Sequence, residues 1–320
     1  ATEYSADLLS QTGIAPAKLP PLVPLGEPRG PLTAAACEHL GIGPDAMLMD
    51  ATIDSVTSAV GTGAIDATRV GVIIGTTTVI VTHVPDKRHD TANGLTAAPS
   101  PVPNSWFLMA ENGIGGKAFD VFVRNVVYPD DGLGLPMPSD GFDRVLAAAA
   151  ASPAGANGAM FQPWLLGSMA PRFRRRMRGG FANLGVDTTR ADMARAVLEG
   201  VAFNAAWLLP HVATLAGGTA PTIALGGGGA ASALWGQIMS DSFGLAVRRL
   251  AHPHATNAHG AALLALTQAG HLALAGIPSM LTTEQLHQPD PAAHELYATR
   301  TAALIDFHDR VAPFYDSLPR

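Results

Sequence analysis

The pattern of apolar and polar residues predicts strands that alternate with helices along most of the chain. The run Val70–Val84 consists largely of β-branched residues on either side of Gly75, which predicts two strands joined by a tight hairpin. A further strand is predicted at Trp106–Met109. From Arg190 to Leu209 apolar residues recur at every third or fourth position, which predicts a long amphipathic helix. This alternation is typical of an α/β fold.

The same pattern predicts shorter elements around these four. Helices are expected at residues 32–40, 54–60, 116–127, 142–151 and 258–269 and close to the C-terminus, and strands at residues 46–49 and 244–250. Residues 1–46 are otherwise rich in proline, and residues 129–139 are expected to form a linker. We find no tandem repeat of about 20–50 residues, which argues against a solenoid.

Two glycine-containing segments predict a site for a nucleotide. An apolar strand runs through the four glycines Gly226–Gly229 straight into an amphipathic helix. Glycine has no Cβ, so its backbone can approach a ligand closely, although a plain strand-to-helix turn has the same pattern. At the hairpin tip, Gly75-Thr76-Thr77-Thr78 offers backbone N–H groups and hydroxyls to phosphate oxygens. Each segment is weak evidence alone, and together they favour phosphate binding.

Asp54 is the candidate catalytic base. It precedes the small residues Ser55, Ser58, Ala59 and Gly61, which leave open space beside its carboxylate. In the phosphorylation of a hydroxyl, an aspartate within hydrogen-bond reach of the attacking oxygen accepts its proton. Asp is also a preferred N-cap residue, so Asp54 can equally start a helix, and the two interpretations are compatible.

Composition narrows the class of partner and the compartment. The chain has 320 residues, of which 48% are hydrophobic and 14% charged, and its formal net charge is −6. Such a length is typical of about two domains, and the acidic balance favours small-molecule partners over nucleic acid or a membrane surface. Cys37 is the single cysteine, which fits a reducing cytoplasm. The apolar window 194–216 is interrupted by Glu199, Asn204 and Pro210, so we expect a buried helix and no membrane span.

Three further groups of residues are expected to have structural roles and not to bind nucleic acid or metal. Five arginines lie within 172–178, but no aromatic platform accompanies them, and a solvated loop is expected there rather than a nucleic acid surface. His252, His254 and His259 do not have the spacing of a metal site, so no metal ligand is predicted. The four tryptophans are expected in the core or in the wall of a cleft.

Several segments resemble the FGGY carbohydrate kinases, nearest to the xylulose kinase type, over most of residues 20–320. The string Arg195–Asn204, with the glycine run downstream, is specific to that family, whereas the shorter segments are not. The resembling segments are Ile53-Asp54-Ser55, Ile74-Gly75-Thr76-Thr77, Arg195-Ala-Val-Leu-Glu-Gly-Val-Ala-Phe-Asn204, Gly227-Gly-Gly-Ala230 to Trp235 and Asn257-Ala-His-Gly-Ala-Ala-Leu263.

The resemblance implies an actin-like ATPase (ribonuclease H-like) fold with a mixed sheet flanked by helices. It further implies an ATP-dependent kinase for a sugar, such as the ketopentose xylulose, with Mg²⁺ accompanying the ATP. Asp54 would then deprotonate the sugar hydroxyl. The ATP phosphates would bind at Gly75, Thr76, Thr77 and Gly116, and adenosine at Gly227, Gly228, Gly229, Ala230 and Asn257. The expected partners are sugar and ATP, without nucleic acid or membrane, and a homodimer is left open.

The departures from the family matter for domain organisation and activity. Residues 1–69 are predicted to be a remnant of an N-terminal sugar-binding domain that carries Asp54, and residues 70–320 to be the C-terminal ATP-binding domain. The family's Asp-x-Gly-Thr phosphate motif is not found, so we expect that much of the first domain is missing from this chain, as in a fragment. The family commonly has Gly-Glu-Arg where this chain has Gly167-Ser168-Met169, and a small residue where it has Lys117.

These departures leave other functions open. Lys117 can contact phosphates, or it can be a solvated lysine in a first helical turn. The protein can also be a regulatory or inactive kinase-like protein that binds a nucleotide and has lost sugar phosphorylation. A third option is another actin-like enzyme, such as a cofactor-activating ATPase, which would hydrolyse ATP without a sugar.

Overall fold

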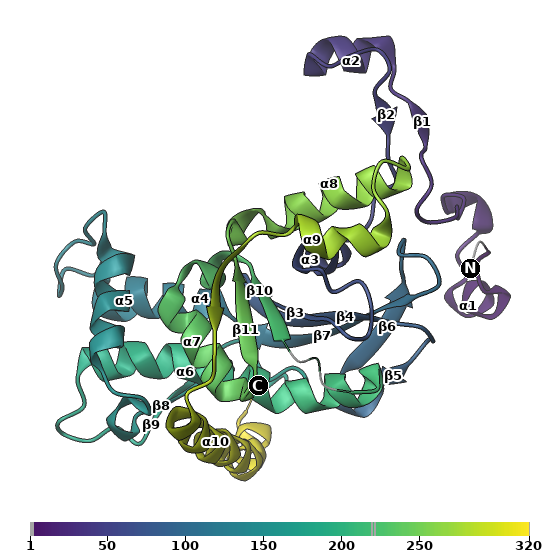
Figure 1. Ribbon diagram of the computed structural model, residues 1–320. Helices are drawn as coiled ribbons and strands as arrows, with labels where there is room; N and C mark the ends of the chain where they lie inside the picture. Colours follow the sequence, from purple (N-terminus) through teal and green to yellow (C-terminus); the bar gives the residue numbers. More distant parts are fainter. Residues whose placement is uncertain (1–2, 219, 221, 320) are drawn as a thin grey trace.

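A mixed sheet of eight strands forms the centre of the computed structural model, which describes residues 3–218, 220 and 222–319 (Figure 1). Its strands are β3 (Val70–Ile74), β4 (Thr77–Val84), β5 (His89–Asp90), β6 (Leu95–Pro99), β7 (Trp106–Ile114), β10 (Thr222–Gly226), β11 (Ala246–Leu250) and β12 (Thr283–His287). Their order is β12-β11-β10-β3-β4-β7-β6-β5. The pairs β11–β10 and β10–β3 are parallel, and every other neighbouring pair is antiparallel.

Helices cover both faces of this sheet (Figure 1). On one face lie α3 (Asp54–Thr62) and α8 (Thr256–Gln268), with α9 (Ile277–Met280) beside them. On the other face lie α4 (Gly116–Phe122), α6 (Arg190–Ala216) and α7 (Ala233–Phe243). Two more helices pack outside this layer, α5 (Gly141–Ala151) against α6 and α10 (Pro291–Ser317) against α6 and α7. A small hairpin of β8 (Met160–Gln162) and β9 (Gly180–Ala182) also packs against α6. The alternation of strands and helices therefore folds as the predicted α/β protein.

Two glycines let α3 and α8 cross in close contact. A Cβ on Gly260 would lie 1.7 Å from the carbonyl oxygen of Thr57, and a Cβ on Gly61 would lie 2.0 Å from that of Thr256. Neither oxygen belongs to a side chain that could move aside, so a larger residue at either position would separate the helices. Because Asp54 is the first residue of α3, this crossing also fixes where its carboxylate lies.

The long helix α6 is a core helix. Thr189 and Asp192 form a capping box at its start, and Gly217, with φ of 88°, ends it. Among the described residues it is the one helix with the length and hydropathy of a membrane span, and 83% of its most apolar window is buried inside the protein. The buried helix predicted at residues 194–216 is therefore confirmed. It continues through Pro210, beyond its predicted end at Leu209.

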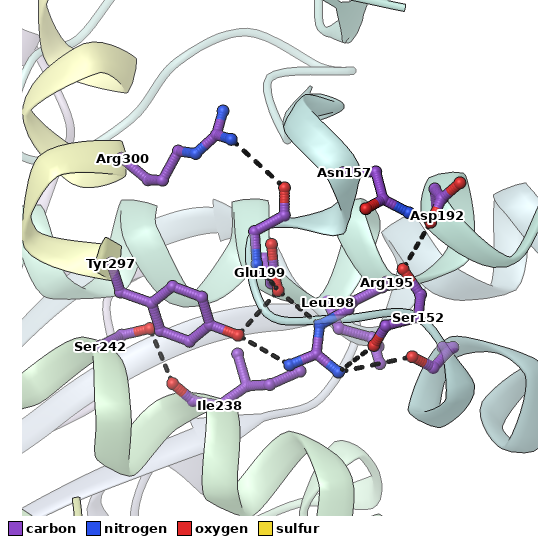
Figure 2. Close-up of polar contacts among 12 residues, drawn as sticks. Ser152, Asn157, Asp192, Arg195, Leu198, Glu199, Ile238, Ser242, Tyr297 and Arg300 are labelled. Carbon is purple, nitrogen blue, oxygen red and sulfur yellow. Dashed lines mark hydrogen bonds and ion pairs between the residues drawn. The ribbon is translucent and has the colours of Figure 1, made fainter. Parts of the chain in front are cut away.

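A buried polar network fastens α6 to α5 and α10 (Figure 2). Arg195 Nε donates to Glu199 Oε1 at 2.7 Å, and the Tyr297 hydroxyl donates to the same oxygen at 2.7 Å. Arg195 Nη1 donates to the carbonyl oxygen of Ser152, the residue that follows α5, at 2.9 Å. Burial raises the pKa of Glu199, and the hydrogen bonds from Tyr297, Arg195 and the Gly155 amide oppose that rise. The network holds α5 in place by its C-terminal end.

Residues 3–53 extend away from the sheet as an arm (Figure 1). The arm contains α1 (Ala6–Thr12), the two-stranded pair β1 (Gly30–Pro31) and β2 (Met47–Leu48), and α2 (Ala34–Leu40). Several large apolar side chains of the arm are exposed, namely Leu8, Ile14, Val23, Leu25, Leu40, Ile42, Met47, Leu48 and Ile53. From α3 onward the chain packs differently, because Val56 and Ala59 are buried with Val81 and Phe107 of the sheet. Residues 54–69 thus share a core with the sheet, and the predicted domain boundary at residue 69 stays a prediction.

Some element boundaries differ from those expected. The strand predicted at residues 106–109 continues to Ile114, and the strand predicted from residue 244 begins at Ala246, because Gly244 adopts φ of 64° and ends α7. The helix predicted at 116–127 is α4 followed by a π-helical turn at Val123–Val127. The strands β5, β6, β8, β9 and β12 were not expected, because their short sequences do not alternate clearly between apolar and polar residues.

Candidate active site

The turn between β3 and β4 lies at the centre of the candidate site. Three backbone hydrogen bonds hold it against the start of α4. Gly75 N donates to the Thr77 carbonyl at 2.9 Å, Gly115 N to the Thr76 carbonyl at 2.9 Å, and Gly116 N to the Gly75 carbonyl at 2.7 Å. A Cβ on Gly116 would lie 2.7 Å from the same Gly75 oxygen, so this contact requires glycine. The hairpin tip and α4 therefore form one fixed unit.

A large cavity of about 690 Å³ lies on one side of this turn. Five of the residues predicted to bind a nucleotide line it, namely Gly75, Thr76, Gly116, Gly228 and Gly229. Its other walls are Ile74, Lys117, Phe119, Asp120, Phe142, Asp143, Leu146, Ala231, Ser232, Trp235 and His254. The two glycine segments, some 150 positions apart, thus meet at one cavity, as the sequence predicts.

A smaller cavity of about 250 Å³ lies at the other side of the turn. Its lining includes Asp54 and Ser58 of α3 together with Thr77. Gly75 and Thr76 line both cavities, so the β3–β4 turn is the partition between them. Among the residues that the structure describes, the hydroxyls of Thr76 and Thr77 make no hydrogen bond. These hydroxyls are therefore available to a ligand that reaches across the turn.

The glycine run packs tightly against β3. A Cβ on Gly227, whose φ is 83°, would lie 2.6 Å from the Ile74 carbonyl oxygen, and one on Gly229 would lie 2.4 Å from Ile74 Cγ2. The helix α7 does not follow directly, which corrects the expected strand-to-helix connection. A 3₁₀ turn at Gly228–Ala231 intervenes, and Ser232 then caps α7 by accepting a hydrogen bond from Trp235 N.

Asp54 is exposed and begins α3. The sequence leaves two interpretations of this residue, a catalytic base and an N-cap residue, and the structure decides the second. Ile53 is the N-cap residue of α3 and Asp54 the first residue within the helix, so the prediction that Asp54 is an N-cap is wrong. Its Oδ1 accepts a hydrogen bond of 3.3 Å from the Ser55 hydroxyl. The carboxylate has no cationic partner among the described residues, which leaves it free to act on a ligand in the smaller cavity.

Three residues predicted to contact adenosine do not line the large cavity. Ala230 is fully buried and Gly227 packs on Ile74. Asn257 lies in the first turn of α8, and its Nδ2 donates to the carbonyl oxygen of Asp54 at 3.0 Å. Their contact with adenosine stays a prediction, and the observed role of Asn257 is to join the starts of α8 and α3.

Several residues of the large cavity were not predicted from the sequence. Phe142, Asp143 and Leu146 belong to α5, whose sequence contains no recognisable motif. His254 lies against Gly228 and lines the cavity, whereas the sequence predicts no ligand contact for the histidines of this loop. Trp235 fits its expected place in a cleft wall, since it is 3% exposed and its Nε1 donates to the Leu198 carbonyl at 3.1 Å.

The Ser168-Met169 segment and the arginine-rich segment 172–178 both lie outside the two cavities. Ser168 is 2% exposed, and its hydroxyl donates to the Arg172 carbonyl at 2.7 Å. The arginines within 172–178 pack in part on α10, because Arg172 pairs with Asp309 and Arg176 donates to the Asp316 carbonyl. Neither Ser168 nor Met169 lines either cavity.

The arrangement suits a transfer between two ligands. The Gly75–Thr76 turn lies between a large cavity with aromatic walls and a smaller one that is lined by the Asp54 carboxylate and by the hydroxyl-bearing residues Thr76 and Thr77. A ligand that filled the large cavity and extended over the turn would place its end beside Asp54. Within residues 3–218, 220 and 222–319, no three His, Cys, Asp or Glu side chains form a metal-binding group.

Comparison with known proteins places this chain in a family. Residues 70–269 match the model of the C-terminal domain of the FGGY family of carbohydrate kinases. A xylulose kinase of Staphylococcus epidermidis is 27% identical over 87% of this chain and 54% of its own length. A gluconokinase of Bacillus subtilis is 26% identical over 93% of this chain and 58% of its own length. The chain therefore spans about half the length of the curated relatives it matches.

A solved structure extends the comparison to the fold. The ligand-bound xylulose kinase from Lactobacillus acidophilus superposes with a TM-score of 0.84 at 22% identity. The match covers 98% of this chain and 62% of that one. At this identity the likeness concerns the architecture, which is the mixed sheet with helices on both faces.

Proposed function

Because this chain belongs to the FGGY family of carbohydrate kinases, whose fold is that of the actin-like ATPases, we propose that it provides the ATP-binding part of a sugar kinase. The reaction is transfer of the γ-phosphoryl group of ATP to a sugar hydroxyl. One observation carries this proposal: the cavity lined by the glycine run and the cavity lined by Asp54 share the Gly75–Thr76 turn.

ATP would occupy the large cavity. Its adenosine would lie near Gly228 and Gly229, which line the large cavity together with His254 and Trp235. Its phosphates would then extend over Gly75 and the hydroxyls of Thr76 and Thr77. The amides of Gly75 and Gly116 already donate to backbone carbonyls. We therefore assign phosphate contact at these two glycines to close approach of the backbone, and hydrogen bonding to the threonine hydroxyls.

Asp54 would act on the sugar in the small cavity. Its carboxylate accepts the proton of the attacking hydroxyl while that oxygen bonds to the γ-phosphorus and the bond from phosphorus to the bridging oxygen breaks. The bridging oxygen leaves with ADP on the opposite side of phosphorus, toward the large cavity. The turn between the two cavities thus lies where acceptor and donor must align.

Magnesium would enter with the nucleotide. Mg²⁺ is commonly bound by substrate phosphates and one or two carboxylates, with water as the remaining ligand, so a dedicated protein cage is not needed. The carboxylates nearest the proposed phosphate path are Asp54 in the small cavity and Asp120 and Asp143 in the large one. When bound, the ion neutralises charge on the β- and γ-phosphoryl oxygens.

The sugar and the organisation of the whole protein are further proposals. We propose a ketopentose such as xylulose, because relatives named xylulose kinase are among the matches in both sequence and fold. We also propose that residues 1–69 belong to a sugar-binding domain and residues 70–320 to the ATP-binding domain. The exposed apolar side chains of the arm support this assignment for residues 3–53, since they are the kind of surface that another domain covers, whereas residues 54–69 share a core with the sheet. A cytoplasmic enzyme is proposed on the single cysteine.

The decisive experiment replaces Asp54 in the full-length gene product. ATP consumption is measured with a panel of pentuloses, polyols and gluconate, and ATP affinity is measured separately. Asp54→Asn is expected to lower sugar-dependent turnover by about 10²–10⁴-fold, because the proton acceptor is lost, with ATP affinity kept within about twofold. Asp66→Asn is the matched control, since Asp66 is a half-exposed aspartate that bonds to Thr68 and Arg69 outside both cavities.

Two other outcomes would each select a different function. ATP binding without turnover for any sugar in the panel would favour a nucleotide-binding regulatory protein. ATP hydrolysis that no sugar stimulates would favour another actin-like ATPase. Turnover that survives Asp54→Asn unchanged would contradict the assigned base.

A further inference from the structure

Lys117 is the one lysine or arginine that lines either cavity of the candidate site in the described part of the chain. It is the second residue of α4, immediately after Gly116, whose amide donates to the Gly75 carbonyl at 2.7 Å. The lysine is therefore anchored to the same turn that separates the two cavities. Its side chain is 51% exposed and shares the large cavity with two carboxylates, Asp120 and Asp143.

A divalent metal ion offsets only part of the negative charge of ATP, so a positively charged side chain in the large cavity would still favour binding of the polyphosphate. ATP brings several negative charges, and the cavity already has two carboxylates. The amides of Gly75, Gly115 and Gly116 are used in backbone hydrogen bonds, so they cannot donate to phosphate without breaking the turn. A lysine ammonium has three N–H donors and a full positive charge, which is the strongest phosphate partner that this lining offers.

The structure also shows how Lys117 can change partners. Its Nζ lies 2.6 Å from Asp120 Oδ2, while Arg124 Nε lies 2.6 Å from Asp120 Oδ1. If Lys117 turns toward a phosphate, Asp120 keeps its bond to Arg124. The ion pair that Lys117 gives up is half-exposed, and exposed ion pairs contribute little to stability. The exchange is therefore inexpensive for the protein and favourable for the ligand.

We propose that Lys117 is a phosphate-binding residue of this chain, which contacts the polyphosphate of the nucleotide in the large cavity. This inference rests on the proposed function, because it takes the ligand to be ATP. The inference adds Lys117 to the residues proposed to bind ATP. The family resemblance predicts a small residue at this position.

The test compares Lys117→Met with Arg124→Met in calorimetric titrations with ATP, ADP and adenosine. Arg124 is the matched control because it pairs with the same carboxylate but does not line the cavity. Methionine also keeps an unbranched stem where Arg124 lies over the Phe142 ring. Lys117→Met is expected to weaken ATP and ADP about 10- to 100-fold and to leave adenosine within about twofold. Arg124→Met is expected to leave all three within about twofold.

Further measurements separate a phosphate contact from a structural effect. The ATP affinity of Lys117→Met should depend less on salt than that of the parent protein, because one charge pair is absent. Lys117→Arg should retain most of the affinity, and thermal unfolding should show the same midpoint for all variants. Unchanged ATP affinity in Lys117→Met, an equal loss for adenosine, or an equal loss in Arg124→Met would overturn the inference alone. A parent protein that binds none of the three ligands would instead overturn the proposed function.

Discussion

A single hydrogen bond joins two residues of the site that are 203 positions apart in the chain. Asn257 Nδ2 donates to the Asp54 carbonyl oxygen at 3.0 Å, so the start of α8 holds the start of α3. The family resemblance implies instead that Asn257 contacts adenosine. The two roles predict different kinetic changes, since a positioning residue acts on the catalytic step and a binding residue on nucleotide affinity.

We predict that Asn257→Ala lowers kcat about two- to tenfold, because the loss of one neutral hydrogen bond lets the Asp54 carboxylate move. The dissociation constant for ATP should stay within about twofold of the parent value. Steady-state kinetics together with ATP titration checks this prediction. Asn93→Ala, which removes a side-chain bond to Asp90 outside both cavities, is the control. A raised ATP dissociation constant with unchanged kcat would favour the adenosine contact.

At the scale of elements, the start of α6 depends on one buried carboxylate. Asp192 is 3% exposed and accepts hydrogen bonds from Ser152 Oγ at 2.6 Å, Asn157 Nδ2 at 2.9 Å and the Thr189 amide at 2.9 Å (Figure 2 shows the first two). Burial acts to raise the pKa of Asp192, but these hydrogen bonds outweigh it and lower the pKa to about 2. The ionised form is therefore favoured in the folded protein.

Because the pKa of Asp192 is lower in the folded than in the unfolded protein, the free energy of unfolding decreases as the pH falls through this range. The ordinary value is 3.8, so the stabilisation from Asp192 is complete above about pH 4 and is lost as the pH falls toward about 2. Asp192→Asn should lower the free energy of unfolding at neutral pH by about 1–3 kcal/mol and flatten its pH dependence between those limits. Urea unfolding as a function of pH measures both. Asp306→Asn, on the exposed face of α10, should change neither, and an unaltered acid dependence in Asp192→Asn would contradict the assignment.

How far the sequence predicts the elements depends on where each lies. The interior hairpin β3–β4 and the helix α6 are predictable, because buried segments must repeat apolar residues at the period of their own structure. The edge strand β12 is not, since four of its five residues, Thr283–Leu286, are exposed and follow no such period. The end of α6 was also missed, because Pro210 usually breaks a helix and here lies within one.

From the sequence alone, only the glycine and threonine segments of the candidate site can be predicted. Gly75 and Gly229 are recognisable because glycine permits a close approach of the backbone to a ligand, and Thr76 because its hydroxyl can bind a phosphate oxygen. The wall from α5 is not, because Phe142 and Leu146 line the cavity through the tertiary packing of α5 on α6, to which Arg195 contributes by its bond to the Ser152 carbonyl. Such tertiary contacts leave no local pattern in the chain.

At the scale of the whole molecule, the sheet carries both halves of the proposed reaction. Its parallel strands β10 and β3 end at the glycine run and at the β3–β4 turn, where the large cavity opens. The helix α3 on one face brings Asp54 to the other side of the same turn. The arm of residues 3–53 leads away from this body (Figure 1), and its exposed apolar side chains support its assignment to a sugar-binding domain.

The most direct measurement is a crystal structure of the protein with Mg²⁺ and a non-hydrolysable ATP analogue. We predict adenosine in the large cavity near Gly228 and Gly229, and the terminal phosphate over Thr76 and Thr77, facing Asp54 across the turn. A nucleotide bound outside the large cavity, or one whose phosphates point away from the Gly75–Thr76 turn, would contradict the account.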